Sequence, residues 1–152
     1  MTIPFTKVSL ILFFLYFLTN DPIIGGLALN CNFSCMIAFE SSRLLFKKDF
    51  SSLFNYYNVD YMIFNFFDFI IHVLPSLILL NLYNYLYISL HFHFLTFLFN
   101  IIWGIYSARG FNLNKVYGLK MSLDEWHVVW FMMYLGHLTP IIIKTHVSMY
   151  NF

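Results

Sequence analysis

Five long apolar runs, separated by short polar segments, follow one another along this chain of 152 residues. They cover residues 3–19, 22–39, 61–81, 84–106 and 124–144. Each run is close to the ~20 residues that, at a rise of about 1.5 Å per residue, cross a hydrocarbon core of roughly 30 Å. The pattern predicts an all-α, polytopic membrane helix bundle with five spans in a single integral membrane domain.

The first two runs each leave an alternative open. Lys7 precedes the first hydrophobic stretch as in a signal peptide, but no small-residue cleavage site follows, which favours a retained anchor. Asp21 and Pro22 are typical of an N-cap and a first helical position, so a second helix is expected to begin there. Polar and small residues dilute this second run: Gly25, Gly26, Asn30, Asn32 and Ser34. The bundle therefore has five spans, or four spans plus a re-entrant segment.

The segments between the runs also carry structural signals. Residues 40–60 mix charged, serine and asparagine residues with scattered leucine and phenylalanine, which is typical of an amphipathic helix on the membrane surface. Asp60 is an expected N-cap for the third run, and a tight antiparallel hairpin is predicted between residues 81 and 84. Ser122 and Glu125 form a capping-box pattern at the start of the last run.

The composition agrees with a membrane protein. Apolar residues make up 61% of the chain, aromatic residues 22% and charged residues only 10%, which is more apolar surface than a soluble domain of this size can hide. The lipid bilayer is therefore the expected partner. A net charge of +1 without a basic stripe excludes nucleic acid, whereas membrane-protein partners stay open. Alanine occurs only three times, so close backbone contact between helices through small residues is not expected.

The basic residues predict an orientation, because short cytoplasmic loops carry an excess of lysine and arginine. With five spans, one side of the membrane receives only Lys144. The other side receives Lys7, Arg43, Lys47, Lys48, Arg109, Lys115 and Lys120. This asymmetry predicts a cytoplasmic N-terminus, with residues 40–60 and 107–121 on the cytoplasmic side.

Asp68 and His72 stand in the middle of the third run, in an otherwise apolar sequence. On insertion scales an Asp near the middle of a spanning helix costs about 2.5–3.5 kcal/mol, so a partner or a function is expected. The two residues are four positions apart, which puts them on one helix face within hydrogen-bond reach. A carboxylate–imidazole pair can fix a tautomer or relay a proton. Both are therefore candidate catalytic residues, and a purely structural polar pair is the alternative.

Three more histidines are polar intramembrane candidates. His137 in the last run and one of His91 and His93 in the fourth run can approach the depth of His72, counted at about 1.5 Å per residue. No HExxH or repeated histidine-box spacing is present, so neither a metal nor a cofactor is predicted. One stripe of the last run has helical spacing, which packing explains without a ligand: Trp126, Trp130, Met133 and His137.

The third run and the residues after it carry a pattern of about 50 residues. It consists of a block from Asp68 to Leu80 that contains His72-Val73-Leu74-Pro75, then Trp103, and Tyr117 after a Gly-containing loop. In this pattern the chain resembles the androgen-induced membrane hydrolase family. The resemblance implies a polytopic bundle that cleaves lipid esters with an intramembrane threonine nucleophile and a histidine, to which His72 would correspond. It assigns no nucleophile, because Thr6 and Thr19, which flank the apolar stretch of residues 8–18 in the first run, lie in no matching context.

Three functions follow for a small multi-pass integral membrane protein. In the first, the polar residues have a structural or assembly role and fix helix packing or the contacts with partners. In the alternatives, the chain is an intramembrane lipid hydrolase that uses His72 oriented by Asp68, or a proton or ion pathway through Asp68, His72 and His137. A hydrolase needs a hydroxyl within about 3 Å of an imidazole, whereas a pathway needs polar groups that continue to both faces.

Overall fold

The computed structural model describes residues 5–46, 60–89, 91, 94–98, 101–102 and 121–150. All regular elements in these ranges are helical, which confirms the all-α class. The longest single helices are α1 (Phe5–Thr19), α2 (Pro22–Leu45) and α8 (Leu123–Tyr150). A further helical stretch is made of α4 (Tyr61–Asp68), the π-helical turn η1 (Phe69–Val73) and α5 (Leu74–Asn81), and the 3-10 turn η2 (Tyr83–Tyr85) follows it.

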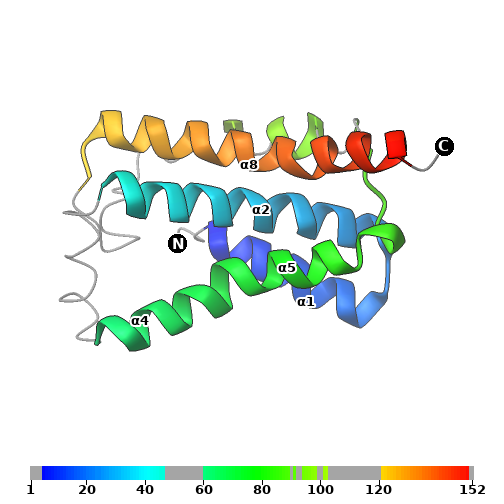
Figure 1. Ribbon diagram of the computed structural model, residues 1–152, viewed down its shortest axis with the longest axis horizontal. Coiled ribbons are helices and arrows are strands. Elements are labelled where there is room, and N and C mark those ends of the chain that lie inside the picture. Colours follow the sequence, from blue (N-terminus) through cyan, green and yellow to red (C-terminus); the bar gives the residue numbers. More distant parts are fainter. Residues whose placement is uncertain are drawn as a thin grey trace.

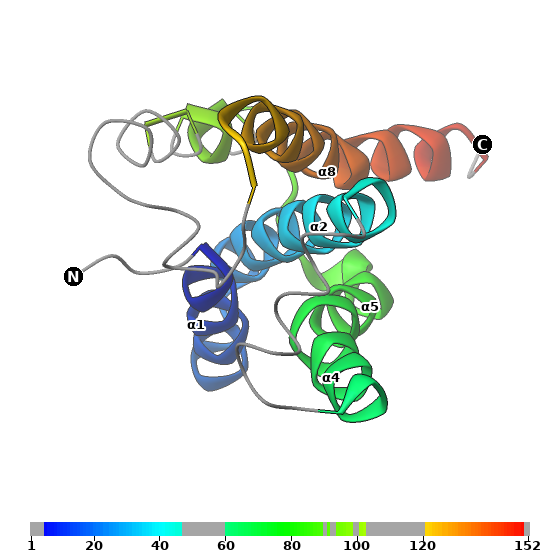
Figure 2. The same cartoon turned by 90° about the vertical axis from the view of Figure 1, so that its left-hand side faces the viewer.

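Helix α2 is the centre of the fold. Helix α8 packs along one side of it, while α1 and the α4–η1–α5 stretch lie on the other (Figure 1 and Figure 2). Residues 28–35 are all buried, and a helix that is buried all round needs neighbours on every side. The second run is thus a continuous central helix, and its polar residues face other helices.

Three helical stretches are long and apolar enough to cross a membrane, namely Pro22–Leu45, Tyr61–Asn81 and Leu123–His146. Large apolar side chains point outward from them; Phe66, Phe67 and Phe131 are each more than half exposed. These lengths and hydropathies indicate a multi-pass integral membrane protein. Helix α1 is also apolar but shorter, because 15 residues cover only about 22 Å.

The predicted helix starts are present. Asp21 accepts a hydrogen bond from the amide of Ile23 at 2.8 Å, with Pro22 as the first helical residue. Asp60 caps α4 in the same way through the amide of Met62, also at 2.8 Å. At the start of α8, the Ser122 amide donates to the Glu125 carboxylate at 2.6 Å and the Glu125 amide donates to the Ser122 hydroxyl at 3.3 Å. These short-range caps were readable from the sequence because each depends on residues that are two or three positions apart.

Helix α2 continues to Leu45, beyond the predicted end of the run at residue 39, so residues 40–45 belong to this helix. Local contacts explain the additional turns. Glu40 and Arg43 form an ion pair at 2.8 Å along the helix, and Arg43 lies in the last turn, where a cation interacts favourably with the helix dipole. The rest of the predicted surface helix, residues 47–59, lies outside the described residues.

The connection after α5 is longer than the predicted hairpin. The 3-10 turn η2 follows α5, and residues 86–89 are not helical, so the fourth run does not begin as a helix at residue 84. The amide of Tyr87 donates to the carbonyl of Pro22 at 2.8 Å, which holds this connection against the start of α2. Residues 91, 94–98 and 101–102 are helical, and the other residues of the predicted span 84–106 from residue 90 onward lie outside the described ranges.

Helices α2 and α8 approach each other closely, which corrects the expectation that small residues would not shape the packing. A Cβ atom at Gly136 would lie 2.7 Å from the carbonyl oxygen of Phe33 and 2.7 Å from Cα of Ser34. The Ser34 hydroxyl donates to the carbonyl of Met133 at 2.7 Å across the same interface. Gly136 and Ser34 therefore allow α2 and α8 to pack closely, although the rarity of alanine predicted no such close contact.

The bundle has two ends, at which the described chain changes direction. Helix α1 ends at Thr19 near η2, whereas α2 ends at Leu45 at the opposite end of the bundle, where α4 and α8 start (Figure 1). Arg43 lies at the second end and Lys144 near the first. The basic residues predict that the second end is cytoplasmic, and this orientation stays a prediction.

Single cysteines introduced at Asn20 and Tyr85 should react with a membrane-impermeant maleimide from one side of the membrane. Cysteines at Tyr61 and Ser122 should react from the opposite, cytoplasmic side, because helices that cross in alternation bring these positions to one end. The parent chain is the control, since Cys31 and Cys35 are buried. Labelling of Asn20 and Ser122 from the same side would contradict the topology.

Candidate functional site

The third helical stretch changes helix type around the polar residues that the sequence singled out. It is an α-helix up to Asp68 and widens to a π-helix over Phe69–Val73, where the Leu74 amide donates to the Phe69 carbonyl. Pro75, which has no amide hydrogen, lies in the first turn of α5, two residues after this π-helical turn. Single π turns are often found at functional sites, and this one carries His72.

Asp68 and His72 form the hydrogen bond that their spacing predicts. His72 Nδ1 lies 2.7 Å from Oδ1 of Asp68. The side chain of Asp68 is 3% exposed and that of His72 is 12% exposed, so water competes little for this bond. An ionised carboxylate can only accept, so with an ionised Asp68 a neutral His72 carries its proton on Nδ1 and leaves Nε2 as an acceptor.

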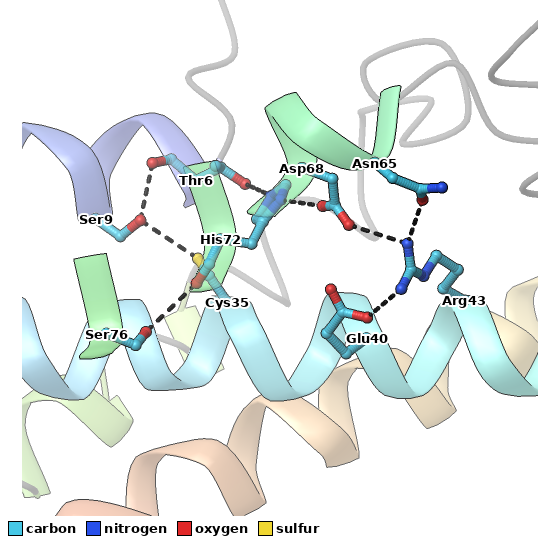
Figure 3. Close-up of polar contacts among 9 residues, drawn as sticks. All are labelled: Thr6, Ser9, Cys35, Glu40, Arg43, Asn65, Asp68, His72 and Ser76. Atoms are coloured by element: carbon cyan, nitrogen blue, oxygen red, sulfur yellow. Dashed lines mark hydrogen bonds and ion pairs between the residues drawn. The ribbon is translucent and has the colours of Figure 1, made fainter. Parts of the chain in front are cut away.

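The remaining ring nitrogen of His72 faces a hydroxyl group. Oγ1 of Thr6 lies 3.4 Å from His72 Nε2, although the two residues are 66 positions apart in the sequence (Figure 3). Thr6 lies in the first turn of α1, and this helix begins about midway along α2 (Figure 1). The separation is long for an O–H···N bond, as is common for catalytic pairs without substrate. The Thr6 hydroxyl, the His72 imidazole and the Asp68 carboxylate thus form one line of successive contacts.

A second layer of polar side chains surrounds the carboxylate of Asp68. Arg43 Nη1 lies 3.3 Å from Asp68 Oδ2 and donates to Oδ1 of Asn65 at 2.7 Å. Nη2 of Arg43 lies 2.8 Å from Oε2 of Glu40. Each oxygen of Asp68 therefore has its own partner, His72 for one and Arg43 for the other, and the carboxylate is held in one orientation.

Further contacts hold the imidazole and the hydroxyl. The ring of Phe39 stacks on His72, with centroids 4.1 Å apart and planes 8° apart. Ser9, one turn after Thr6, donates to the Thr6 carbonyl at 2.8 Å and lies 3.5 Å from Sγ of Cys35. Helix α2 thus contacts both halves of the site, and it fixes α1 and η1 relative to each other.

The other candidate histidines are placed differently. His137 is fully buried on α8, and its ring meets Phe5 of α1 edge-on with centroids 6.5 Å apart. His91 occupies an exposed helical position, and His93 lies outside the described residues. In the part of the chain that the structure describes, no group of three or more His, Cys, Asp and Glu side chains could hold a metal ion.

The arrangement can perform nucleophilic chemistry. The Nε2 atom of His72 can accept the proton of the Thr6 hydroxyl, and Asp68 can stabilise the resulting imidazolium. Thr6 and Arg43 were both missed as partners of the pair by reasoning from the sequence. The neighbours of Thr6 match no motif, so the sequence assigns it no role, and the sequence predicts Arg43 in a surface segment.

No family model, curated protein or solved structure matches this chain. Its function is therefore inferred from its class, a multi-pass membrane protein by helix length and hydropathy, and from the geometry of this site.

Proposed function

We propose that this protein is an intramembrane hydrolase that cleaves ester bonds in lipids. The observation that carries the proposal is the line from Thr6 through His72 to Asp68, with separations of 3.4 Å and 2.7 Å. A nucleophile, a base and a group that orients the base recur in covalent catalysis on unrelated folds.

In the proposed reaction, the hydroxyl oxygen of Thr6 attacks the carbonyl carbon of the ester while His72 Nε2 takes the hydroxyl proton. The bond between that carbon and the alcohol oxygen then breaks, and His72 gives its proton to the leaving alcohol. Water attacks the acyl-threonine next, with His72 again as the base, which releases the carboxylic acid and restores Thr6. Asp68 accepts the Nδ1 hydrogen bond throughout and stabilises the imidazolium in each half-reaction.

The surroundings of the site favour an apolar ester. Phe67 and Phe69, which flank Asp68, are 54% and 45% exposed, and on α1 Ile11 and Phe14 are 59% and 61% exposed. Side chains of this kind contact acyl chains in a bilayer. A lipid whose chains lie in the bilayer would therefore reach Thr6 from the membrane rather than from water.

A structural or assembly role is the second candidate, and the contacts of Arg43 favour it. Arg43 joins α2 to α4 through Asn65 and Asp68, so the same network also fixes helix packing. A proton pathway would extend from Asp68 and His72 to His137, whose ring contact with Phe5 brings it near the start of α1. Neither role requires Thr6 to react, and this difference is the basis of the test.

The proposed function predicts that a fluorophosphonate probe labels the purified protein in detergent at Thr6. Thr6→Ala should abolish the labelling, because it removes the nucleophilic oxygen, and Thr6→Ser should keep it. Thr19→Ala is the matched control on the same helix, since the Thr19 hydroxyl donates to the carbonyl of Leu15 at 2.8 Å and lies at the far end of α1. Labelling is read by in-gel fluorescence, and peptide mass spectrometry identifies the modified residue.

Two outcomes would overturn the hydrolase proposal. The first is a folded parent protein that is not labelled and does not release fatty acid from lipid esters in vesicles. The second is labelling that persists in Thr6→Ala, which would put the reactive group elsewhere. Either result, with unchanged thermal stability of Thr6→Ala, would leave the structural role as the better account of the pair.

A further inference from the structure

We infer that Glu40 and Arg43 are positioning residues that set the pH range in which His72 acts as a base. This rests on the proposed function, because it concerns the same imidazole. Both residues lie one turn apart on α2, and both act on His72 through Asp68 (Figure 3). They therefore extend the line of Thr6, His72 and Asp68 by a cation and a second carboxylate.

The geometry gives Arg43 two tasks. Its Nη1 atom holds Asp68 Oδ2 at 3.3 Å, so that Oδ1 is turned toward His72 at 2.7 Å. Its Nη2 atom binds Glu40 at 2.8 Å, which brings a second negative charge into the cluster. Glu40 also lies close enough to interact electrostatically with Asp68 and His72.

The charges in this cluster act on the imidazolium that forms when His72 takes the proton of Thr6. When both carboxylates are ionised and His72 is neutral, Glu40 and Asp68 together carry one more charge than the guanidinium of Arg43 balances. The imidazolium that forms in the reaction brings this cluster to neutrality, and charges interact strongly where the surroundings are apolar. The same balance stabilises the imidazolium that forms during ester cleavage.

The helices packed against η1 bring few other titratable groups to His72. Helix α1 contributes Thr6 and Ser9, which do not titrate in this range, while its Lys7 is exposed. Helix α2 contributes Cys35 besides the Glu40–Arg43 pair, and α5 carries no charged residue. Among the described residues, Glu40 and Arg43 are therefore the groups through which the charge around Asp68 and His72 can be changed without touching the reacting atoms.

The test is the pH dependence of ester hydrolysis by the full chain in detergent, with a short-chain p-nitrophenyl ester as the probe. Glu40→Gln removes a negative charge and should move the acidic limb of the profile to lower pH by about half a pH unit or more. Arg43→Gln removes the positive charge and should move the same limb to higher pH. Arg43→Lys keeps the charge and should move it less than Arg43→Gln does.

Asp124→Asn is the control for a change of charge alone, because Asp124 is fully exposed at the start of α8. Its acidic limb should coincide with that of the parent. Displacements of opposite sign in Glu40→Gln and Arg43→Gln support the inference, and an unmoved limb in Glu40→Gln overturns it. If Arg43→Gln does not fold, Glu40→Gln decides alone.

The failure of this inference is distinguishable from the failure of the proposed function. Loss of activity in Thr6→Ala together with an unmoved limb in Glu40→Gln would remove only the role of the Glu40–Arg43 pair. Full activity in Thr6→Ala would remove the hydrolase mechanism itself, whatever the pH profiles show.

Discussion

Replacing Thr6 and His72 together is expected to cost no more activity than replacing either residue alone. Thr6→Ala and His72→Ala should each lower kcat/KM for ester hydrolysis by about a thousandfold or more, because each removes one half of the nucleophile–base pair. Once the nucleophile is absent, the base has no proton to remove. The double variant should therefore be as slow as the single variants, and initial rates on one ester measure all three.

Ser9→Ala provides the matched control for this cycle. The Ser9 hydroxyl donates to the carbonyl of Thr6 and lies 3.5 Å from Sγ of Cys35. Neither of these contacts involves the imidazole of His72. Its loss should reduce the rate less than about tenfold, since it changes only the support of α1. Multiplicative losses in Thr6→Ala and His72→Ala would mean that the two groups act independently, which contradicts a shared proton transfer.

The features that the sequence predicted correctly are those that depend on neighbouring residues. The caps at Asp21, Asp60 and Ser122 are local hydrogen bonds. The Asp68–His72 contact depends only on two residues four positions apart on one helix. Such contacts follow from helix geometry alone and need no knowledge of the tertiary fold.

Thr6 could not be assigned from the sequence, because its role depends on how far α1 extends along the bundle. A helix that crossed the whole bilayer would place Thr6 near the surface. Helix α1 is instead only 15 residues long and begins beside the middle of α2, where Asn32 Nδ2 donates to the Ser9 carbonyl at 3.1 Å (Figure 1). This position brings Thr6 to the level of His72.

Arg43 could not be assigned to the site from the sequence, because the second helix is longer than its apolar run predicts. Its charged and serine-rich neighbours are typical of a surface loop, yet the helix continues through them to Leu45. A buried Asp68 is expected to have a polar partner, and the structure provides two, Arg43 on α2 and His72. A charged stretch after an apolar helix can be recognised as part of that helix only when a neighbouring helix is known to bury a side chain of opposite charge beside it.

The largest loss of stability in this polar network is expected from Arg43→Leu. Within the described part of the chain, Arg43 is the one cation paired with both Glu40 and Asp68, so its removal leaves these two neighbouring carboxylates without that positive charge. Removing one member of a buried ion pair costs about 3–5 kcal/mol. Because Arg43 is 33% exposed, a cost of about 2–4 kcal/mol in the free energy of unfolding is expected.

Adding Asp68→Leu to Arg43→Leu should restore part of that stability, because the carboxylate that is 3% exposed is then gone while Glu40, at 29%, can still reach water. The recovery should be about 1 kcal/mol or more, and it makes the cycle strongly non-additive. Unfolding in mixed micelles with increasing SDS measures the free energies, with Arg43→Lys as the charge-preserving control. If the double variant is less stable than Arg43→Leu by the full cost of Asp68→Leu alone, the two side chains are not coupled, and Asp68 is held in the bundle by His72 without help from α2.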